Sequence, residues 1–464
     1  MTHHPQPAPF RPETAILTLG EAFYDPVRPA NFPQTILRFR NDRWAEAVGL
    51  GSLGDDDWLR YFGRFEPLEG SLGEPLALRY HGHQFRVYNP DIGDGRGFLF
   101  AQVRDNADRL LDFGTKGSGQ TPYSRFGDGR LTLKGGMREI LATEMLEALG
   151  VETSKTFSLV ETGEALERGD EPSPTRSAVL VRLQHSHIRI GTFQRLAYLG
   201  EAENMRRLTE YCLVHYFGGS AGEDGPALLL ARVAERAADL AASYIAAGFV
   251  HGVLNSDNIA ITCESFDYGP WRWTPYWDGG FTAAYFDHAG LYAFGRQPEA
   301  IHWDVVQLAA SLRTITEAEV LTPVLEAFPA LFQERLRAAI CARLGVHPRS
   351  DADDAALVAA LEMGLGVHQV TLDRFFFDWR GGALRRPTEI YDGDGFADFL
   401  AVVSAYEPAA SLDHPYWSDE QPCSMHIEEV EAIWSKIDQG DDWSALEAKV
   451  ADVRRMGEAM RGAA

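Results

Sequence analysis

The sequence predicts an α+β protein of two lobes, with a mixed β-sheet in the first lobe and mainly helices in the second. Its 464 residues suffice for one large core or for two to three smaller ones, so a two-lobed enzyme is an ordinary expectation. Strands are predicted at 98–103 and 110–116 and, from their β-branched residues, at 155–162 and 177–183. From residue 227 onward, apolar residues recur at helical spacing instead.

The first half of the chain is expected to hold two parts. Residues 1–75 mix Pro, Trp and acidic residues with short helical pieces, and we expect them to pack on the core as an N-terminal extension. Residues 76–185 form the predicted N-lobe, which also holds one amphipathic helix that begins near Gly136. Gly150 follows the last apolar position of that helix and marks its end.

The second half is predicted to be helical. Residues 186–320 form the C-lobe around an Ala- and Leu-rich helix at 227–247, and a second core helix is expected to open near Asp304. Residues 321–464 are predicted to be helices joined by acidic turns. Because no internal repeat or low-complexity linker separates these parts, we expect them to pack as one unit.

Charge and cysteine content exclude several classes of protein. The formal net charge of −24 argues against a nucleic-acid-binding protein, because phosphate backbones need clustered cations. The four cysteines show neither CxxC spacing nor a paired framework, which favours a reducing compartment over structural zinc or disulfides. Neither a signal-peptide pattern nor a run of about 18 uncharged apolar residues occurs. We therefore expect a cytoplasmic monomer that binds neither nucleic acid nor membrane.

Two glycine-rich turns lie on either side of a predicted strand that ends in Lys116. The first is GDGRG at 93–97, where the small residues let backbone N–H groups approach an anion closely. Gly-Asp-Gly is also common in ordinary hairpin turns, which is the alternative for this segment alone. The second lies in TPYSRFGDGR at 121–130. Two such loops around one lysine favour phosphate binding more than either loop would alone.

Lys116 and Glu139 have the order of a functional ion pair. A lysine on a strand and a glutamate on the next helix pair in kinases, and the pair aims the lysine at the nucleotide. The alternatives are a solvated strand-end charge for Lys116 and a first-turn acid favoured by the helix dipole for Glu139. Arg182 and Arg189 follow, and arginine suits bidentate phosphate binding. The apolar neighbours of Arg182 predict that it is partly buried.

The stretch from His251 to Pro270 has the layout of a magnesium-nucleotide site. Asn258 and Asp267 offer oxygen ligands, as a catalytic-loop Asn and a later Asp do in kinases. Kinases place a proton-accepting Asp two residues after the loop His, and Val253 stands at that position here. Asp257 is the only carboxylate left in this loop. An ATP site with a displaced base indicates either an inactive pseudokinase or an enzyme that uses the nucleotide differently.

Taken together, the motifs resemble the selenoprotein O family, the YdiU-like protein adenylyltransferases. The resemblance spans about residues 75 to 310 and rests on GDGR, TKGSGQTPYSRFGDGR, MREILATEM, Arg182 with Arg189, HGVLNSDN, DYGP and YAFGRQPEAIHWDVVQLA. It implies a protein-kinase-like fold that binds ATP in an inverted orientation. The implied activity is transfer of AMP, or in some settings UMP, to Ser, Thr or Tyr hydroxyls of proteins.

The resemblance also assigns roles to single residues. It implies that Asp257 accepts a proton, that Asn258 and Asp267 hold Mg²⁺ or Mn²⁺, and that Lys116 and Glu139 form a structural ion pair. The implied nucleotide contacts are Gly93, Gly95, Arg96, Lys116, Asp128, Gly129, Arg182, Arg189 and Asp267.

The sequence departs from the family pattern at several positions. The loop around Ala283 and Ala284 has no cysteine, and the chain ends MGEAMRGAA without the family's Cys or selenocysteine. YHGH at 80–83 and Gly135-Gly136 replace the commoner YAGH and Ser-Ser. We therefore expect a divergent branch that lacks this redox switch.

We expect an enzyme, a protein adenylyltransferase that uses ATP and a divalent cation on protein substrates. A phosphotransferase acting on a protein or a small molecule is the first alternative, because the same residues hold Mg-ATP. A non-catalytic nucleotide-binding scaffold is the second.

Overall fold

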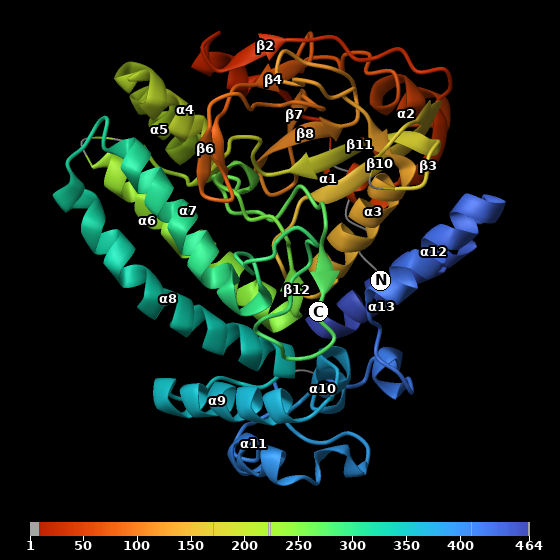
Figure 1. Ribbon diagram of the computed structural model, residues 1–464, viewed down its shortest axis with the longest axis vertical. Helices are drawn as coiled ribbons and strands as arrows, with labels where there is room; N and C mark the ends of the chain where they lie inside the picture. Colours follow the sequence, from red (N-terminus) through yellow and green to blue (C-terminus); the bar gives the residue numbers. More distant parts are fainter. Residues whose placement is uncertain (1–8, 170, 221, 223, 410, 463–464) are drawn as a thin grey trace.

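The computed structural model describes residues 9–169, 171–220, 222, 224–409 and 411–462, in which a curled antiparallel sheet lies above a set of long helices (Figure 1). The sheet has nine strands among these residues, in the order β2-β4-β7-β8-β11-β10-β3, with β1 beside β7 and β9 beside β11. The strands are β1 (Pro12–Glu13), β2 (Tyr24–Pro26), β3 (Ile36–Arg40), β4 (Leu76–Leu78), β7 (Leu99–Arg104), β8 (Leu110–Lys116), β9 (Leu131–Thr132), β10 (Lys155–Leu166) and β11 (Thr175–Gln184). Residues 1–75 thus supply three strands of this sheet.

The expectation of a mixed sheet is wrong, since all the described pairings in this sheet are antiparallel. The reason is the connections: hairpins join β7 to β8 and β10 to β11, whereas parallel pairing needs a crossover of a dozen or more residues. The four strands predicted from the sequence are confirmed as β7, β8, β10 and β11, with ends that differ by a few residues. Every residue of β8 is buried, including Lys116 at its end.

Helix α3 (Leu133–Ala148) packs against β10 and β11 and carries Glu139 inward. Its first turn is capped by the Thr132 hydroxyl, which accepts a hydrogen bond from the Gly135 amide at 3.1 Å. Gly136 lies so close to Leu159 that a Cβ would clash with that side chain, so glycine is what lets the helix approach the sheet. The helix predicted near Gly136 is therefore confirmed, with a start three residues earlier.

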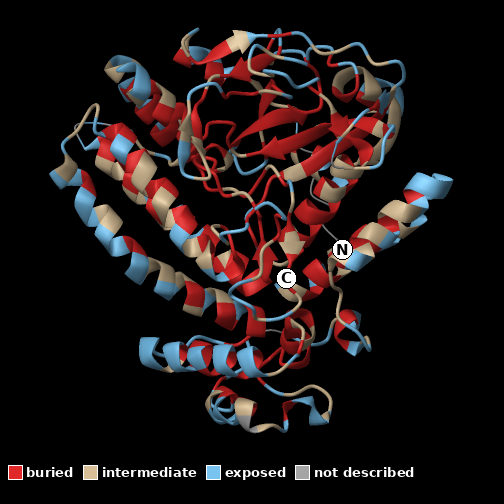
Figure 2. Ribbon diagram, in the orientation of Figure 1, coloured by how far each residue is buried: buried red, intermediate tan, exposed pale blue. Residues whose placement is uncertain are grey.

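The remaining elements are mainly helical, and their inner faces are buried while their outer faces are exposed (Figure 2). The helices are α1 (Asp42–Ala47), α2 (Asp55–Phe62), α4 (Ile190–Leu199), α5 (Ala202–Tyr216), α6 (Gly225–Ala247), α7 (Gln297–Leu312), α8 (Ala318–Leu344), α9 (Asp351–Val367), α10 (Leu372–Asp378), α11 (Ala397–Val403), α12 (Ile427–Gly440) and α13 (Ser444–Arg461). Two small ribbons accompany them, β5 (Gly82–Gln84) with β6 (Val87–Asn89) and β12 (Phe249–Val250) with β13 (Arg272–Trp273).

Helix α6 delivers the chain to the loop at 251–267. It packs against α7 and α8 and ends at Gly248, whose φ of 68° suits a residue without a side chain. Helix α7 starts at Gln297 and not near Asp304, because Pro298 in its first turn has a φ already set for a helix. Within the described part of the chain, no helix is both long enough and apolar enough to cross a bilayer.

The C-terminal helices return to the first half of the chain. Helix α13 packs against α3, where Arg454 of α13 pairs with Glu144 of α3 at 2.6 Å. Asp441, between α12 and α13, pairs with Arg176 of β11 at 2.7 Å. The helix that carries Glu139 is therefore covered by the sheet on one side and by the end of the chain on another.

Candidate functional site

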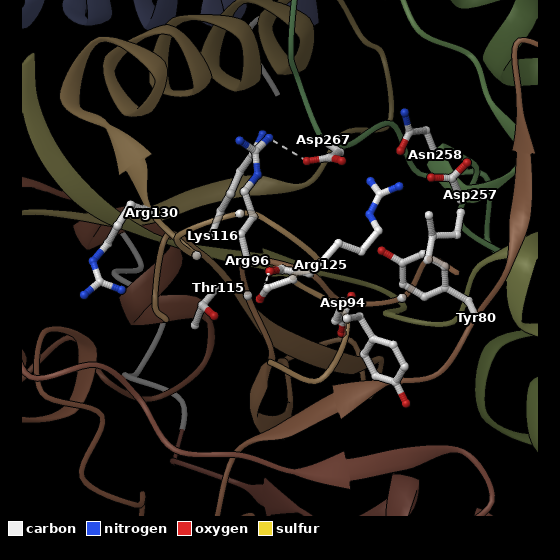
Figure 3. Close-up of a pocket in the computed structure, with 18 of the residues that line it drawn as sticks. Tyr80, Asp94, Arg96, Thr115, Lys116, Arg125, Arg130, Asp257, Asn258 and Asp267 are labelled. Atoms are coloured by element: carbon white, nitrogen blue, oxygen red, sulfur yellow. Dashed lines mark hydrogen bonds and ion pairs between the residues drawn. The ribbon is translucent and has the colours of Figure 1, made fainter. Parts of the chain in front are cut away.

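A cavity of ≈ 730 Å³ lies where β8, β11, the two glycine loops and the loop at 251–267 meet (Figure 3). This volume falls within the range of about 300–1,000 Å³ that is usual for ligand sites. The lining includes all the nucleotide, metal and proton-accepting residues predicted from the sequence: Gly93, Gly95, Arg96, Lys116, Asp128, Gly129, Arg182, Arg189, Asp257, Asn258 and Asp267. The fold thus brings together groups from four separate stretches of chain.

Lys116 is held by two carboxylates. Its ammonium group pairs with Glu139 from α3 and, at 2.9 Å, with Oδ1 of Asp267. Lys116 is 4% exposed and Glu139 1% exposed. The alternatives of a solvated lysine and a solvated first-turn acid are therefore wrong, and the predicted pair is formed.

Asp267 is the centre of a group of cations. Arg182 Nη1 lies 3.4 Å from the same Oδ1 that Lys116 contacts. Burial alone would raise the pKa of Asp267, but the charges of Lys116, Arg182 and Arg189 lower it well below its usual value, so the carboxylate stays ionised. Its φ of 61° is uncommon for a residue with a side chain, and such backbone strain persists only where the surroundings impose it.

Arg182 and Arg189 are buried arginines that share an aromatic contact. Their guanidinium carbons lie 5.1 Å and 4.8 Å from the ring centre of Phe266, the residue before Asp267. Arg189 also lies 4.5 Å from the ring centre of Tyr80. Cation–π contacts of this kind stabilise an arginine that has been removed from water.

Asp94 lines the cavity but was not among the site residues predicted from the sequence. It is buried between two predicted phosphate-loop glycines, and its carboxylate pairs with Arg189 Nη2 at 3.3 Å and His187 Nε2 at 3.0 Å. It also accepts a hydrogen bond from the Leu78 amide at 3.0 Å. Burial raises its pKa, and the charges of His187 and Arg189 outweigh that effect and lower it. The acidic residue in GDGR was the only local signal, and turn chemistry accounts for it equally well.

The two glycine loops pack on each other. A Cβ at Gly93 would come within 2.5 Å of the Tyr123 ring, and a Cβ at Gly95 within 3.0 Å of the Tyr123 carbonyl oxygen. Gly129 has a φ of 70° and crosses the backbone of Gly119. These positions therefore need glycine because the two loops approach each other closely, whereas the sequence predicted glycine there for close approach to an anion.

Asp128 lies at the rim of the cavity. Its carboxylate pairs with Arg168 at 2.8 Å and accepts a hydrogen bond from the Arg130 amide at 2.9 Å. Its side chain is 48% exposed. A bound nucleotide would therefore meet it near the opening and not beside Lys116.

The loop that holds Asp257 is fixed by the β5–β6 ribbon. The Ser256 hydroxyl accepts a hydrogen bond from the His83 amide at 2.8 Å, and Asn255 Oδ1 accepts one from the Phe85 amide at 2.9 Å. Gly82 lies against Asp257, since a Cβ there would be 2.8 Å from Asp257 Cβ and 2.9 Å from Oδ1. The ribbon thus forms a wall that removes Asp257 from water.

Asp257 has the environment of a proton acceptor. Burial raises its pKa to about 7, although the Arg189 charge opposes the shift. Its Oδ1 is buried and has no hydrogen-bond partner among the described residues. A carboxylate with a pKa near neutrality and a free oxygen suits general-base chemistry.

Asn258 and Asp267 fit a divalent cation that also binds phosphate. The amide nitrogen of Asn258 donates to the Val253 carbonyl at 3.1 Å, which leaves its amide oxygen as the ligand atom. Asp267 directs Oδ1 at Lys116 and Arg182, so Oδ2 is the oxygen left for a cation. Mg²⁺ usually takes one or two carboxylates and completes its octahedron with waters and substrate phosphates, which suits this small oxygen set.

One protein family and several known proteins are similar to this chain over most of its length. The family described as Protein adenylyltransferase SelO matches residues 9–385. A Protein nucleotidyltransferase YdiU from Synechococcus elongatus is 49% identical over 474 aligned residues, which cover 96% of this chain and 95% of that protein. Proteins of the same name from Gloeobacter violaceus and Synechocystis sp. are 41% and 50% identical, covering 96% and 72% of this chain and 95% and 70% of theirs.

Proposed function

Because this chain belongs to the SelO family of protein adenylyltransferases and is a nucleotidyltransferase, we propose that it transfers AMP from ATP to Ser, Thr or Tyr hydroxyls of other proteins. The observation that carries the proposal is that one cavity holds two different groups of charged residues. Lys116 and Arg182 converge on Asp267, while Asp257 keeps an unpaired carboxylate oxygen. The first group suits phosphates and a metal, and the second suits an acceptor hydroxyl.

We propose that ATP binds inverted with respect to its orientation in kinases. The buried cations Lys116, Arg182 and Arg189 would then hold the terminal phosphates, and the α-phosphorus would face the acceptor. Val253 occupies the position of the kinase base, which removes the group that would serve a γ-phosphate. Cations beside the leaving pyrophosphate act where negative charge develops, which is the most effective place for electrostatic stabilisation.

We propose that Asn258 and Asp267 hold Mg²⁺ or Mn²⁺ together with the phosphates of ATP. A divalent cation bound there would withdraw charge from the phosphate oxygens. Asp267 is suited to this because its low pKa keeps it ionised at any physiological pH. Lys116 and Arg182 would keep its carboxylate in place before the nucleotide arrives.

The proposed reaction is a displacement at the α-phosphorus. The acceptor hydroxyl oxygen forms a bond to that phosphorus, and the bond from the phosphorus to the α,β-bridging oxygen breaks. Pyrophosphate leaves with the electron pair of the broken bond, and the hydroxyl proton passes to the Asp257 carboxylate. The products are an adenylylated protein, pyrophosphate and a protonated Asp257 that returns its proton to solvent.

The test compares ATP labelled at the α-phosphate with ATP labelled at the γ-phosphate. We expect label to reach protein from the α position alone, both on acceptors and on the enzyme itself. Transfer from the γ position alone would instead identify a phosphotransferase. Nucleotide binding without any covalent label, in the presence of a native lysate as the source of acceptors, would identify a non-catalytic scaffold.

Several finer features belong to the same proposal. UTP would serve as a second donor, with UMP transferred, because the cations hold phosphates and not the base. The parts at 76–185 and 186–320 would act as the lobes of a kinase-like fold, with 1–75 and 321–464 packed around them. The protein would work as a cytoplasmic monomer without binding nucleic acid. Competition between UTP and α-labelled ATP tests whether UTP is a second donor. Light scattering of the purified protein tests whether it is a monomer.

A further inference from the structure

Two cations of the cavity have no acidic partner. Lys116 and Arg182 share Asp267, and Arg189 pairs with Asp94. The two rim arginines are paired as well, Arg130 with Glu164 at 2.8 Å and Arg168 with Asp128 at 2.8 Å. Within the described part of the chain, the side chains of Arg96 and Arg125 make no ion pair or hydrogen bond, although both line the cavity. On a chain of net charge −24, unpaired cations in a cavity point to an anionic ligand.

Arg125 is held in an unusual backbone conformation by its neighbours. Its φ is 52°, in the left-handed region that residues with a side chain rarely adopt. Ser124 anchors the loop on one side: its hydroxyl donates to the Gly95 carbonyl at 2.5 Å and accepts from the Thr121 amide at 2.8 Å. The Gly127 amide closes the turn by donating to the Ser124 carbonyl at 2.7 Å. The loop therefore fixes the backbone of Arg125 and the direction in which its exposed side chain leaves that backbone.

That direction is toward the proton acceptor. Figure 3 shows the Arg125 side chain extending to the side of the cavity that holds Asp257, whereas Arg96 lies beside Lys116. The two unpaired cations thus serve different ends of the cavity.

We propose that Arg125 binds the phosphate group that is transferred, an inference that rests on the adenylyltransferase function proposed above. The acceptor hydroxyl must lie beside Asp257 to give up its proton and must reach the α-phosphorus in the same step. The unpaired cation nearest Asp257 is therefore within reach of the α-phosphate. The planar guanidinium can donate to both non-bridging oxygens of that phosphate while the bond to pyrophosphate breaks.

The test uses three variants, in each of which the folded state is checked by thermal unfolding. Arg125→Gly removes the guanidinium and fits the left-handed backbone, and Arg125→Lys keeps the charge but not the fork of donors. Asp108→Gly is the control for the backbone change, because Asp108 also has a left-handed φ, 62°, but lies outside the cavity and pairs with Arg11. Transfer from α-labelled ATP and nucleotide affinity are measured for each.

We expect Arg125→Gly to lower the rate of transfer at saturating ATP by about 10²–10³-fold, the usual effect of removing a donor to a transition state. Nucleotide affinity should change by less than about threefold, because the remaining cations hold the terminal phosphates. Arg125→Lys should recover part of the rate, and Asp108→Gly should match the wild type. If Arg125→Gly transfers AMP at the wild-type rate, or loses only nucleotide affinity, the role assigned to Arg125 is wrong and the proposed function still stands. Transfer of γ-label by the wild type would overturn the proposed function with it.

Discussion

The two sides of the cavity differ in whether their charged side chains are paired. On the Lys116 side, the buried charged groups have oppositely charged neighbours: Lys116 and Arg182 contact Asp267, and Glu139 contacts Lys116. The exposed Arg96 is the exception on this side among the described residues. On the Asp257 side, one carboxylate oxygen and the Arg125 guanidinium are unpaired among the described residues.

This difference assigns binding of the substrate to the Lys116 side and the reaction itself to the Asp257 side. Buried charges are tolerated when they are paired, so the Lys116 side is stable without a ligand and positions its groups in advance. Unpaired groups gain their interactions only when substrate arrives, which places the effect of binding on the reacting atoms. Substitutions on the two sides should therefore separate stability from catalysis.

The largest expected effect is on the Asp257 side. Asp257→Asn removes the proposed proton acceptor and should lower transfer of α-label by about 10²–10⁴-fold, the usual contribution of a general base. Nucleotide affinity should stay close to that of the wild type, because Asp257 accepts a proton and holds no phosphate. Labelling assays and nucleotide titration check both statements. A variant that transfers at the wild-type rate would remove Asp257 from the mechanism.

The same variant also changes how stability depends on pH. In the wild type, burial raises the folded pKa of Asp257 to about 7, above its unfolded value of about 3.9. The folded state therefore holds this proton more tightly, and the associated stability is lost as the pH rises through about 7. Asp257→Asn avoids that loss, so its advantage in free energy of unfolding should grow from about pH 4 to 7 and then level off. Urea unfolding at several pH values, with a chelator and without nucleotide, measures it.

The next largest effect is expected from a substitution on the Lys116 side, and it is a loss of stability. Glu139→Gln leaves the buried Lys116 with Asp267 as its only acidic partner. Removing one partner of a buried pair costs about 3–5 kcal/mol when nothing replaces it, and the second carboxylate should reduce the cost to about 2–3 kcal/mol. Chemical denaturation measures this loss.

Glu147→Gln on the same helix is the control for Glu139→Gln. Glu147 pairs with the half-exposed Arg43 at 2.7 Å, and such a pair contributes about 0.2–1 kcal/mol. Equal losses for the two variants would mean that burial does not distinguish the paired side from an ordinary surface.

The smallest effect is expected from a variant that moves Asp257 without removing its carboxylate. Gly82→Ala places a methyl group 2.8 Å from Asp257 Cβ, so either the ribbon or the carboxylate must shift. We expect transfer to fall about tenfold, which corresponds to about 1.4 kcal/mol of barrier, with nucleotide affinity unchanged. Gly73→Ala has no atom near the added methyl group and should behave as the wild type. If both variants transfer at the same rate, the ribbon does not position Asp257.

Local patterns in the sequence predicted several helices and strands and helped to select the residues that line the cavity. Helical periodicity identified α3, α6 and α7, and β-branched and apolar runs identified β7, β8, β10 and β11. These patterns and the family resemblance together selected residues that all line one cavity, apart from Glu139, which pairs with Lys116. Such signals survive because propensity and turn chemistry act over a few neighbouring residues.

Apart from the predicted Lys116–Glu139 pair, the tertiary structure decided which of these groups are paired. Asp94 meets its partners His187 and Arg189 across 93 and 95 positions of the chain, and Arg182 meets Asp267 across 85. Gly82 and Arg125 gain their significance only because the fold brings them toward Asp257. Residue types determine which charges exist, but a charge is buried, paired or left open by packing between segments far apart in the sequence.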